Sequence, residues 1–237
     1  MTNLVYYLDG PKGNFVPTVE DIGEPGPGEL RLRTLRTSVC QSDVVIYRQG
    51  LSRIRSWPAV ILHEVSCVVD AVGKGVSRFA VGDLVGLGCD IPCGDPSCIY
   101  CGEAGTGDWT SCPNTHATGH EFPGFARKYA VLPEWFVARG PVVRFGPAVS
   151  PDDACHLEPL ACNLEGLTRV NACIENRVAV LIGSGSQGAY ALPSCLAMGA
   201  RKVILVNRGR ERLDRVRSVE RRVGKEGSSR GSALNQQ

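Results

Sequence analysis

The sequence lacks the features that direct a protein to a membrane or to nucleic acid. It has no apolar run that approaches the roughly 18 residues of a membrane span. Residues 1–13 contain no basic segment followed by an apolar stretch and a small-residue cleavage site. The net charge is only +2, and this excess lies in residues 219–237. We therefore expect a globular, cytoplasmic protein with neither a membrane nor a nucleic-acid partner.

A disulfide framework is also unexpected, although the chain has 11 cysteines. Cysteines stay reduced in the cytosol, so a cluster of them indicates a metal site. Cys93, Cys98, Cys101 and Cys112 are separated by four, two and ten residues, and Cys89 is an alternative ligand. Four thiolates at this spacing can enclose one zinc ion, with Zn–S distances of about 2.3 Å, in a structural site. The segment 93–112 has no Lys or Arg, which argues against a zinc ribbon that binds nucleic acid.

The pattern of the chain changes near residue 150 and again near residue 218. Residues 1–150 consist of short β-rich runs separated by Gly and Pro, which predicts a barrel-like domain. Residues 151–217 contain a helix with Ser150 as its N-cap, and then a strand, a helix and a second strand. Residues 218–237 are polar and aperiodic, which predicts an aberrant, disordered tail. The fold class is therefore α/β, with a β-rich domain followed by the start of a doubly wound domain.

Residue types that bind metals occur at three places before the strand-helix-strand segment. We read the run 29–40 as a strand that ends at the segment Cys40–Asp43, which contains Ser42. His63 and Glu64 lie about twenty residues later. Glu158 lies in the expected helix. Each motif alone is weak, because an isolated buried Cys or His is more often part of a core. Their order around the cysteine cluster makes the pattern specific.

Together these motifs resemble the zinc-dependent medium-chain dehydrogenases, the family of alcohol, sorbitol and threonine dehydrogenases, over residues 1–217. The resemblance implies a GroES-like barrel domain followed by a Rossmann-type cofactor domain. It implies that Cys40, His63 and an acidic residue, Glu64 or Glu158, hold a catalytic zinc. Glu158 is typical of the polyol branch, whereas Cys162 keeps the ligand set of simple alcohol dehydrogenases open.

The chemistry of such a site follows from its donors. A zinc ion with an open position is a Lewis acid that acidifies a bound alcohol, and hydride can then pass to a nicotinamide ring. By resemblance Ser42 passes the alcohol proton outward; alternatively it caps local backbone. Two residues depart from the family pattern, because Leu62 and Cys67 stand where glycines are usual. If those glycines allow close backbone approach, these side chains crowd the zinc pocket.

The strand-helix-strand segment carries the turn Gly183-x-Gly185-x-x-Gly188 between its first strand and its helix. Glycines there allow a dinucleotide pyrophosphate to approach the helix N-terminus. Asn207 and Arg208 follow the next strand, where an Arg suits a 2′-phosphate, so NADP is favoured over NAD. Pro193 should kink the helix or cost it a hydrogen bond.

The sequence thus predicts a zinc-dependent oxidoreductase that transfers hydride between an alcohol or polyol and NAD(P), with one catalytic and one structural zinc. Only two strands of a Rossmann-type sheet are recognisable, so we expect this activity to be impaired. The alternative is a zinc-binding module without catalysis. The resemblance also implies that full-length relatives form homo-oligomers.

Overall fold

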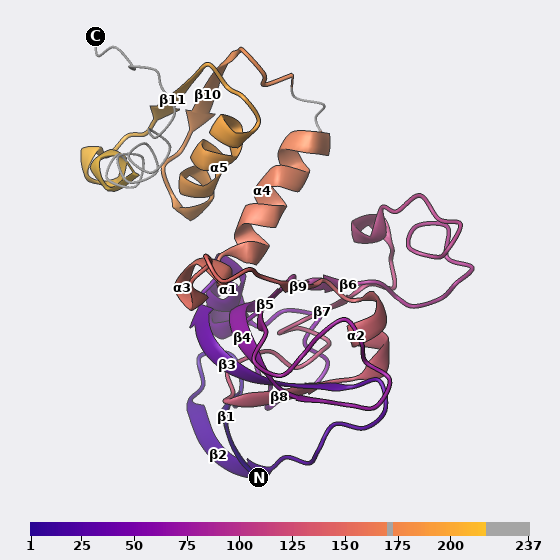
Figure 1. Cartoon of the computed structure of the whole chain (residues 1–237). Coiled ribbons are helices and arrows are strands. Elements are labelled where there is room, and N and C mark those ends of the chain that lie inside the picture. The colour runs from indigo at the N-terminus through magenta and orange to yellow at the C-terminus, as the bar shows by residue number, and fades with distance from the viewer. Residues whose placement is uncertain (170–172, 217–237) are drawn as a thin grey trace. The chain divides into compact units, whose positions relative to one another are not determined.

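The computed structural model describes residues 1–169 and 173–216, and the chain divides into two compact units, Met1–Glu158 and Pro159–Gln237. The predicted tail, residues 218–237, lies outside the described residues. Within the described residues, no helix is long and apolar enough to cross a membrane. The α/β fold class is confirmed (Figure 1).

The first unit is organised around a five-stranded antiparallel sheet with the order β8-β3-β4-β5-β9, so β8 and β9 form its edges. These strands are Leu30–Ser38 (β3), Glu64–Val72 (β4), Leu84–Leu87 (β5), Tyr129–Leu132 (β8) and Val142–Arg144 (β9). A hairpin of Thr2–Leu8 (β1) and Phe15–Asp21 (β2) joins β8 through Asn3, whose side-chain amide exchanges two hydrogen bonds with the backbone of Tyr129. The short pair Asp90–Ile91 (β6) and His116–Ala117 (β7) flanks the cysteine-rich loop.

The pairing of β3 with β4 contains two irregularities that compensate each other. Asp70 is the extra residue on β4, between the partners of Arg31 and Leu32, and Leu35 is the extra residue on β3. The register at Ser38↔Glu64 is therefore the same as at Leu30↔Val72. Bulges of this kind bend a strand locally without ending it.

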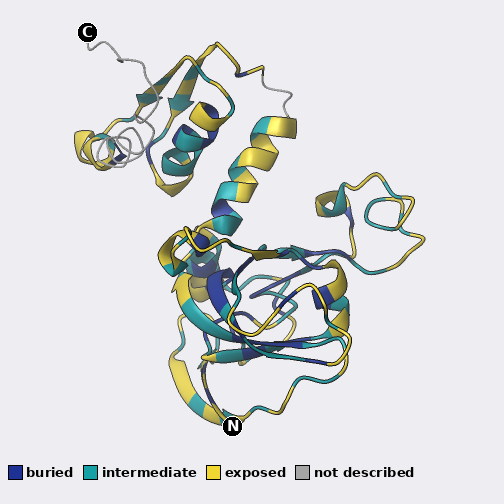
Figure 2. Ribbon diagram, viewed as in Figure 1, coloured by how far each residue is buried: buried dark blue, intermediate teal, exposed yellow. Residues whose placement is uncertain are grey.

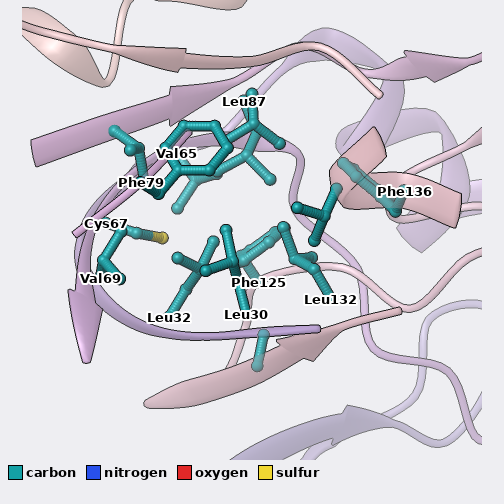
Figure 3. Close-up of a cluster of buried hydrophobic side chains, with 14 of the residues drawn as sticks. Leu30, Leu32, Val65, Cys67, Val69, Phe79, Leu87, Phe125, Leu132 and Phe136 are labelled. Carbon is teal, nitrogen blue, oxygen red and sulfur yellow. The ribbon is translucent and has the colours of Figure 1, made fainter. Parts of the chain in front are cut away.

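The main hydrophobic core lies against this sheet. In Figure 3, Leu30 and Leu32 of β3 point toward Phe79, Val65 and Leu87, and Phe136 closes one end. These side chains are at most 6% exposed. Their burial supplies the main favourable free energy of folding for the unit.

Two elements of the first unit differ from the prediction. In sequence, residues 125–138 resemble two strands, but in the structure only β8 is a strand, and Glu134–Arg139 is helix α2. Pro133 serves as its N-cap residue and Glu134 favours the positive end of the helix, while Phe136 and Val137 are buried. The strand expected to end at Cys40–Asp43 ends at Ser38, and Cys40 is the N-cap residue of helix α1, Gln41–Gln49.

The helical segment expected after Ser150 is confirmed. The Ser150 hydroxyl accepts a hydrogen bond of 3.1 Å from the N–H of Asp153, and Pro151 occupies the first turn of helix α3, Pro151–Ala154. Helix α4, Leu157–Arg169, follows and carries Glu158 in its first turn.

The second unit contains one strand-helix-strand unit, as the sequence predicts. Strand β10, Val178–Ile182, pairs in parallel with β11, Lys202–Val206, and helix α5, Ser186–Ala197, connects them. Helix α5 continues through Pro193. Alternate residues of both strands are exposed, including Val180, Ile182 and Val206, as the yellow segments of Figure 2 show.

Candidate metal and cofactor sites

Cys40, His63 and Glu64 meet in the first unit. One ligand atom of each lies within 4.8 Å of the other two. The pairing of Ser38 with Glu64 brings the end of β3 to the start of β4, so that Cys40 lies opposite His63 and Glu64. Both His63 and Glu64 are buried, with 3% and 6% of their surface exposed.

The carboxylate of Asp43 holds this group in place. Its Oδ2 accepts a 2.8 Å hydrogen bond from the N–H of Cys40, and its Oδ1 accepts one of 3.2 Å from the N–H of Leu62. Oδ1 also lies 3.8 Å from Nδ1 of His63. Burial raises the pKa of Asp43, against the lowering effects of His63 and of these two hydrogen bonds.

Glu64 is held by hydrogen bonds from two residues of β3 and from Cys155. The hydroxyl of Ser38 donates to its Oε2, and the hydroxyl of Thr37 donates to its backbone carbonyl at 3.0 Å. The thiol of Cys155 donates to the same carbonyl at 3.4 Å, and burial raises the pKa of this thiol. These hydrogen bonds fix the orientation of the Glu64 carboxylate relative to Cys40 and His63.

The residues around Cys40 fit a metal ion. Within the described part of the chain, Nδ1 of His63 and Oγ of Ser42 are buried and have no hydrogen-bond partner. Buried polar atoms are rarely left in this state, so the pocket is incomplete in protein atoms alone. A thiolate, an imidazole and a carboxylate are donors that zinc accepts.

Glu158 and Ser42 have different positions relative to this group. Ser42 lies in helix α1, not at the end of a strand as expected, two residues from Cys40. Glu158 lies in the first turn of α4 and does not belong to any of the groups of potential ligands found among the described residues. Its role as a ligand stays a prediction, as does that of Cys162, which is exposed on α4.

Leu62 shows why a glycine is usual directly before the His-Glu pair. Its φ angle is 76°, in the left-handed region that costs side-chain-bearing residues free energy. Residues 124–126 fix this segment, because the N–H of Phe125 donates to the Leu62 carbonyl at 2.8 Å and the N–H of Gly124 donates to that of Val60 at 2.7 Å. Cys67 is fully buried within β4, and burial raises its pKa to about 12.

The four cysteines of the lobe also converge. Their sulfur atoms lie within 4.8 Å of one another, with Sγ–Sγ distances of 3.3 Å for Cys93 and Cys101, 3.5 Å for Cys98 and Cys101, and 3.7 Å for Cys98 and Cys112. A tetrahedral zinc with bonds of about 2.3 Å separates its sulfurs by roughly 3.8 Å, so the set fits one zinc ion. In Figure 1 the lobe projects from the β6 and β7 strands.

Cys89, an alternative lobe ligand in the sequence analysis, lies elsewhere. Its sulfur belongs to a group with His63 and His120 whose ligand atoms lie within 4.8 Å of one another. Cys89 lies outside the lobe because it directly precedes β6, whereas the lobe begins after that strand. No local motif marks His120, which reaches the group through the pairing of β6 with β7.

The glycine-rich turn of the second unit has the conformation that its sequence requires. Gly183 has a φ of 107°, and Gly185 is the N-cap residue of α5. A Cβ at Gly188 would lie 2.0 Å from the carbonyl oxygen of Gly183, so helix and strand approach closely there. Asn207 accepts a 3.4 Å hydrogen bond from the N–H of Ser184 and follows β11, with Arg208 next in the chain.

Comparison with known proteins agrees with this architecture. Residues 26–142 match the alcohol dehydrogenase GroES-like domain. L-threonine 3-dehydrogenase of Pyrococcus horikoshii is 31% identical over 188 residues, which cover 78% of this chain and 50% of that enzyme. Galactitol 1-phosphate 5-dehydrogenase of Escherichia coli is 27% identical over 186 residues, with the same coverage. The chain thus spans about half the length of the curated relatives it matches.

Solved structures show the same fold. An alcohol dehydrogenase of Thermotoga maritima superposes with a TM-score of 0.81 at 20% identity, over 92% of this chain and 61% of that one. A protein described as a zinc-binding dehydrogenase of Sinorhizobium meliloti 1021, bound to NADP, has a TM-score of 0.76 at 25% identity, over 92% and 60%. The chain belongs to the zinc-dependent medium-chain dehydrogenase family, the relatives of the alcohol dehydrogenases.

Proposed function

We propose that this chain carries the metal site and the first half of the cofactor site of an oxidoreductase that transfers hydride between an alcohol or polyol and NAD(P). The observation that carries the proposal is the group of half-buried Cys40 with buried His63 and Glu64, beside which the Ser42 hydroxyl has no hydrogen-bond partner among the described residues. The domain division at about residue 150 and a cytoplasmic location are parts of the same proposal.

Zinc, when bound by Cys40, His63 and an acidic residue, supplies a Lewis acid that lowers the pKa of an alcohol. Asp43 fixes the His63 ring through its Nδ1 side, and it orients the Cys40 backbone at the start of α1. The Ser42 hydroxyl has no hydrogen-bond partner among the described residues, so it is available to accept the alcohol proton while it donates its own proton outward. Asp43 and His63 are buried, whereas Cys40 and Ser42 are half-buried.

Cofactor selection is assigned to the second unit. Gly183, Gly185 and Gly188 leave room for a pyrophosphate at the N-terminus of α5, and Asn207 and Arg208 stand where the ribose is recognised. Arg208 favours a 2′-phosphate and hence NADP over NAD. Turnover by the 237 residues alone is expected to be low, because the described part of this unit contains a single strand-helix-strand unit and such a site uses strands on both sides of its crevice.

Metal analysis of the 237-residue chain tests this function. We expect two zinc equivalents, one in the four-cysteine lobe and one at His63. His63→Ala should lose one equivalent and keep the other, whereas His116→Ala, a change in the neighbouring strand β7, should keep both. Loss of neither metal in His63→Ala would refute the assignment.

A second measurement separates a catalytic site from a structural one. A catalytic zinc site keeps an open coordination position, while a structural site is closed. Free imidazole, added as a probe ligand, should therefore change the visible spectrum of Co²⁺ bound at His63 when the lobe is filled with Zn²⁺. A spectrum that does not respond would favour the zinc-binding module without catalysis.

A further inference from the structure

His63 belongs to two groups of potential ligands. One contains Cys40 and Glu64, and the other contains Cys89 and His120, again with all three ligand atoms within 4.8 Å of one another. The second group is assembled by strand pairing: Cys89 precedes β6, His120 follows β7, and the N–H of Thr118 donates to the Cys89 carbonyl at 3.0 Å. Cys89 and His120 are thus brought together by the strand pairing, without a contribution from α1.

His120 is in the form that binds metal. Its Nδ1 lies 3.2 Å from the carbonyl oxygen of Thr118, and only a protonated nitrogen can donate to that acceptor. In the neutral ring Nε2 then carries the lone pair, the arrangement common to metal-ligating histidines.

The spacing of the two rings also suits one ion. The ring centroids of His63 and His120 are 5.8 Å apart. Two imidazoles on one tetrahedral zinc, with Zn–N of about 2.0–2.1 Å, have centroids roughly 5 Å apart, so a small adjustment suffices. Within the described residues the Thr118 hydroxyl oxygen is buried without a hydrogen-bond partner, a sign that protein atoms alone do not complete this pocket.

We propose that His63, Cys89 and His120 form a second ligand set, which binds a borderline divalent ion such as Zn²⁺ or Co²⁺ in place of the set of Cys40, His63 and Glu64. The two sets share His63, so only one of them binds an ion at a time. A neutral imidazole has one nitrogen lone pair, so His63 can bind one ion at a time.

The second set differs from the first in its chemistry. It combines one thiolate with two neutral imidazoles and has no carboxylate, so an ion held there carries one more unit of net positive charge than with Cys40, His63 and Glu64. Like the first set, it has three ligands and leaves a fourth coordination position open. The inference rests on the proposed function only in that both sets use His63.

Co²⁺ binding to Cys40→Ser tests the second set. Serine is a favoured N-cap residue, so α1 should be retained, and its neutral hydroxyl is a poor replacement for a thiolate ligand. With the lobe first filled by Zn²⁺, Cys40→Ser should still bind one Co²⁺ and still show a thiolate-to-cobalt charge-transfer band, now from Cys89. Circular dichroism verifies the fold of each variant.

Second changes in the Cys40→Ser background identify the ligands. Adding Cys89→Ser should abolish the charge-transfer band, and adding His120→Gln should cause loss of bound Co²⁺. Adding His116→Gln, the matched control, should change neither. The proposal is overturned if Cys40→Ser, correctly folded, binds no Co²⁺ beyond the lobe, or if His120→Gln leaves its binding unchanged.

The same series distinguishes this proposal from the function on which it rests. If His63→Ala loses the second metal while Cys40→Ser also loses it, the Cys40 site stands and the second set is wrong. If His63→Ala keeps both metals, the proposed function fails as well.

Discussion

The carboxylate of Asp43 lies 3.8 Å from Nδ1 of His63, and both side chains are at most 4% exposed. Asp43 therefore acts on the metal-ligand group without belonging to it. Asp43→Asn keeps the shape and removes the charge, and it leaves one oxygen to accept from the N–H groups of Cys40 and Leu62. We expect metal affinity at His63 to fall by about 10- to 100-fold, the usual effect of changing a group that orients a ligand.

Competition with a chromophoric chelator measures this affinity. The lobe should bind its zinc as before, and Asp83→Asn, a change near Arg144 and away from the metal-ligand group, is the control. Equal affinities in Asp43→Asn and the unchanged protein would show that Asp43 does not orient His63.

The left-handed backbone of Leu62 predicts a reversed order of stability for two substitutions. Both Leu62→Ala and Leu62→Gly remove the same packing, but only glycine adopts a φ of 76° without steric cost. At ordinary positions alanine is the more stable by about 0.4–1 kcal/mol. Here we expect Leu62→Gly to be more stable than Leu62→Ala by about 1 kcal/mol.

Denaturant unfolding of the two Leu62 variants checks this order. The pair Val81→Ala and Val81→Gly, at a 67% exposed residue without positive φ, should show the ordinary order. If alanine is the more stable at both sites, the conformation of Leu62 carries no measurable cost.

Cys67 predicts a loss of stability at alkaline pH. Its pKa is raised from 9.0 to about 12 by burial, so between these values the thiol ionises in the unfolded chain and stays protonated in the fold. The unfolded state then binds fewer protons, and the free energy of unfolding falls as pH rises, by about 1.4 kcal/mol per pH unit at most. Below pH 9 the effect disappears.

Cys67→Val removes this titration. The free energy of unfolding of the variant should fall less steeply than that of the unchanged chain between pH 9 and pH 10.5, as measured by urea titration. Cys173→Val, at an exposed thiol, is the control for the loss of a cysteine. Parallel pH profiles for Cys67→Val and the unchanged chain would contradict the prediction.

Two glycines of the cofactor turn should respond differently to alanine. In Gly188→Ala the new Cβ meets the Gly183 carbonyl oxygen at 2.0 Å, so strand and helix must separate, at a cost of about 1–3 kcal/mol. Gly185→Ala meets nothing within 4 Å and should barely change stability. Thermal unfolding compares them, and equal stabilities would mean that α5 yields freely at this point.

In metal-free protein, Cys98 should react faster than Cys101. N–H groups of Cys101 and Tyr100 lower its pKa to about 6, whereas burial raises that of Cys101 to about 12. At pH 7 iodoacetamide should therefore modify Cys98 before Cys101, because the thiolate is the nucleophile. Mass spectrometry follows the order, and zinc should protect both residues. Faster reaction of Cys101 would reverse the assignment.

Local spacing was enough to predict some features and not others. The lobe cysteines lie within 20 residues, so one loop can bring them together, and the cofactor turn is a local strand-turn-helix signal. Helix α2 was misread because Trp135, Phe136 and Val137 favour strands, while Pro133 and the burial of Phe136 decide for a helix. His120 and Cys89 meet His63 only through the pairing of β6 with β7, which no short motif encodes.

The two extra residues in the β3–β4 pair let these strands differ in length without moving the metal-ligand group. Leu35 and Asp70 have no partner on the opposite strand, and the pairs on either side of each follow one another without a gap in the other strand. Deleting Leu35 would therefore remove one bulge, while Ser38 would still pair with Glu64. The bend of β3 would change, because a bulge bends and twists its strand, but the partner of Glu64 would not.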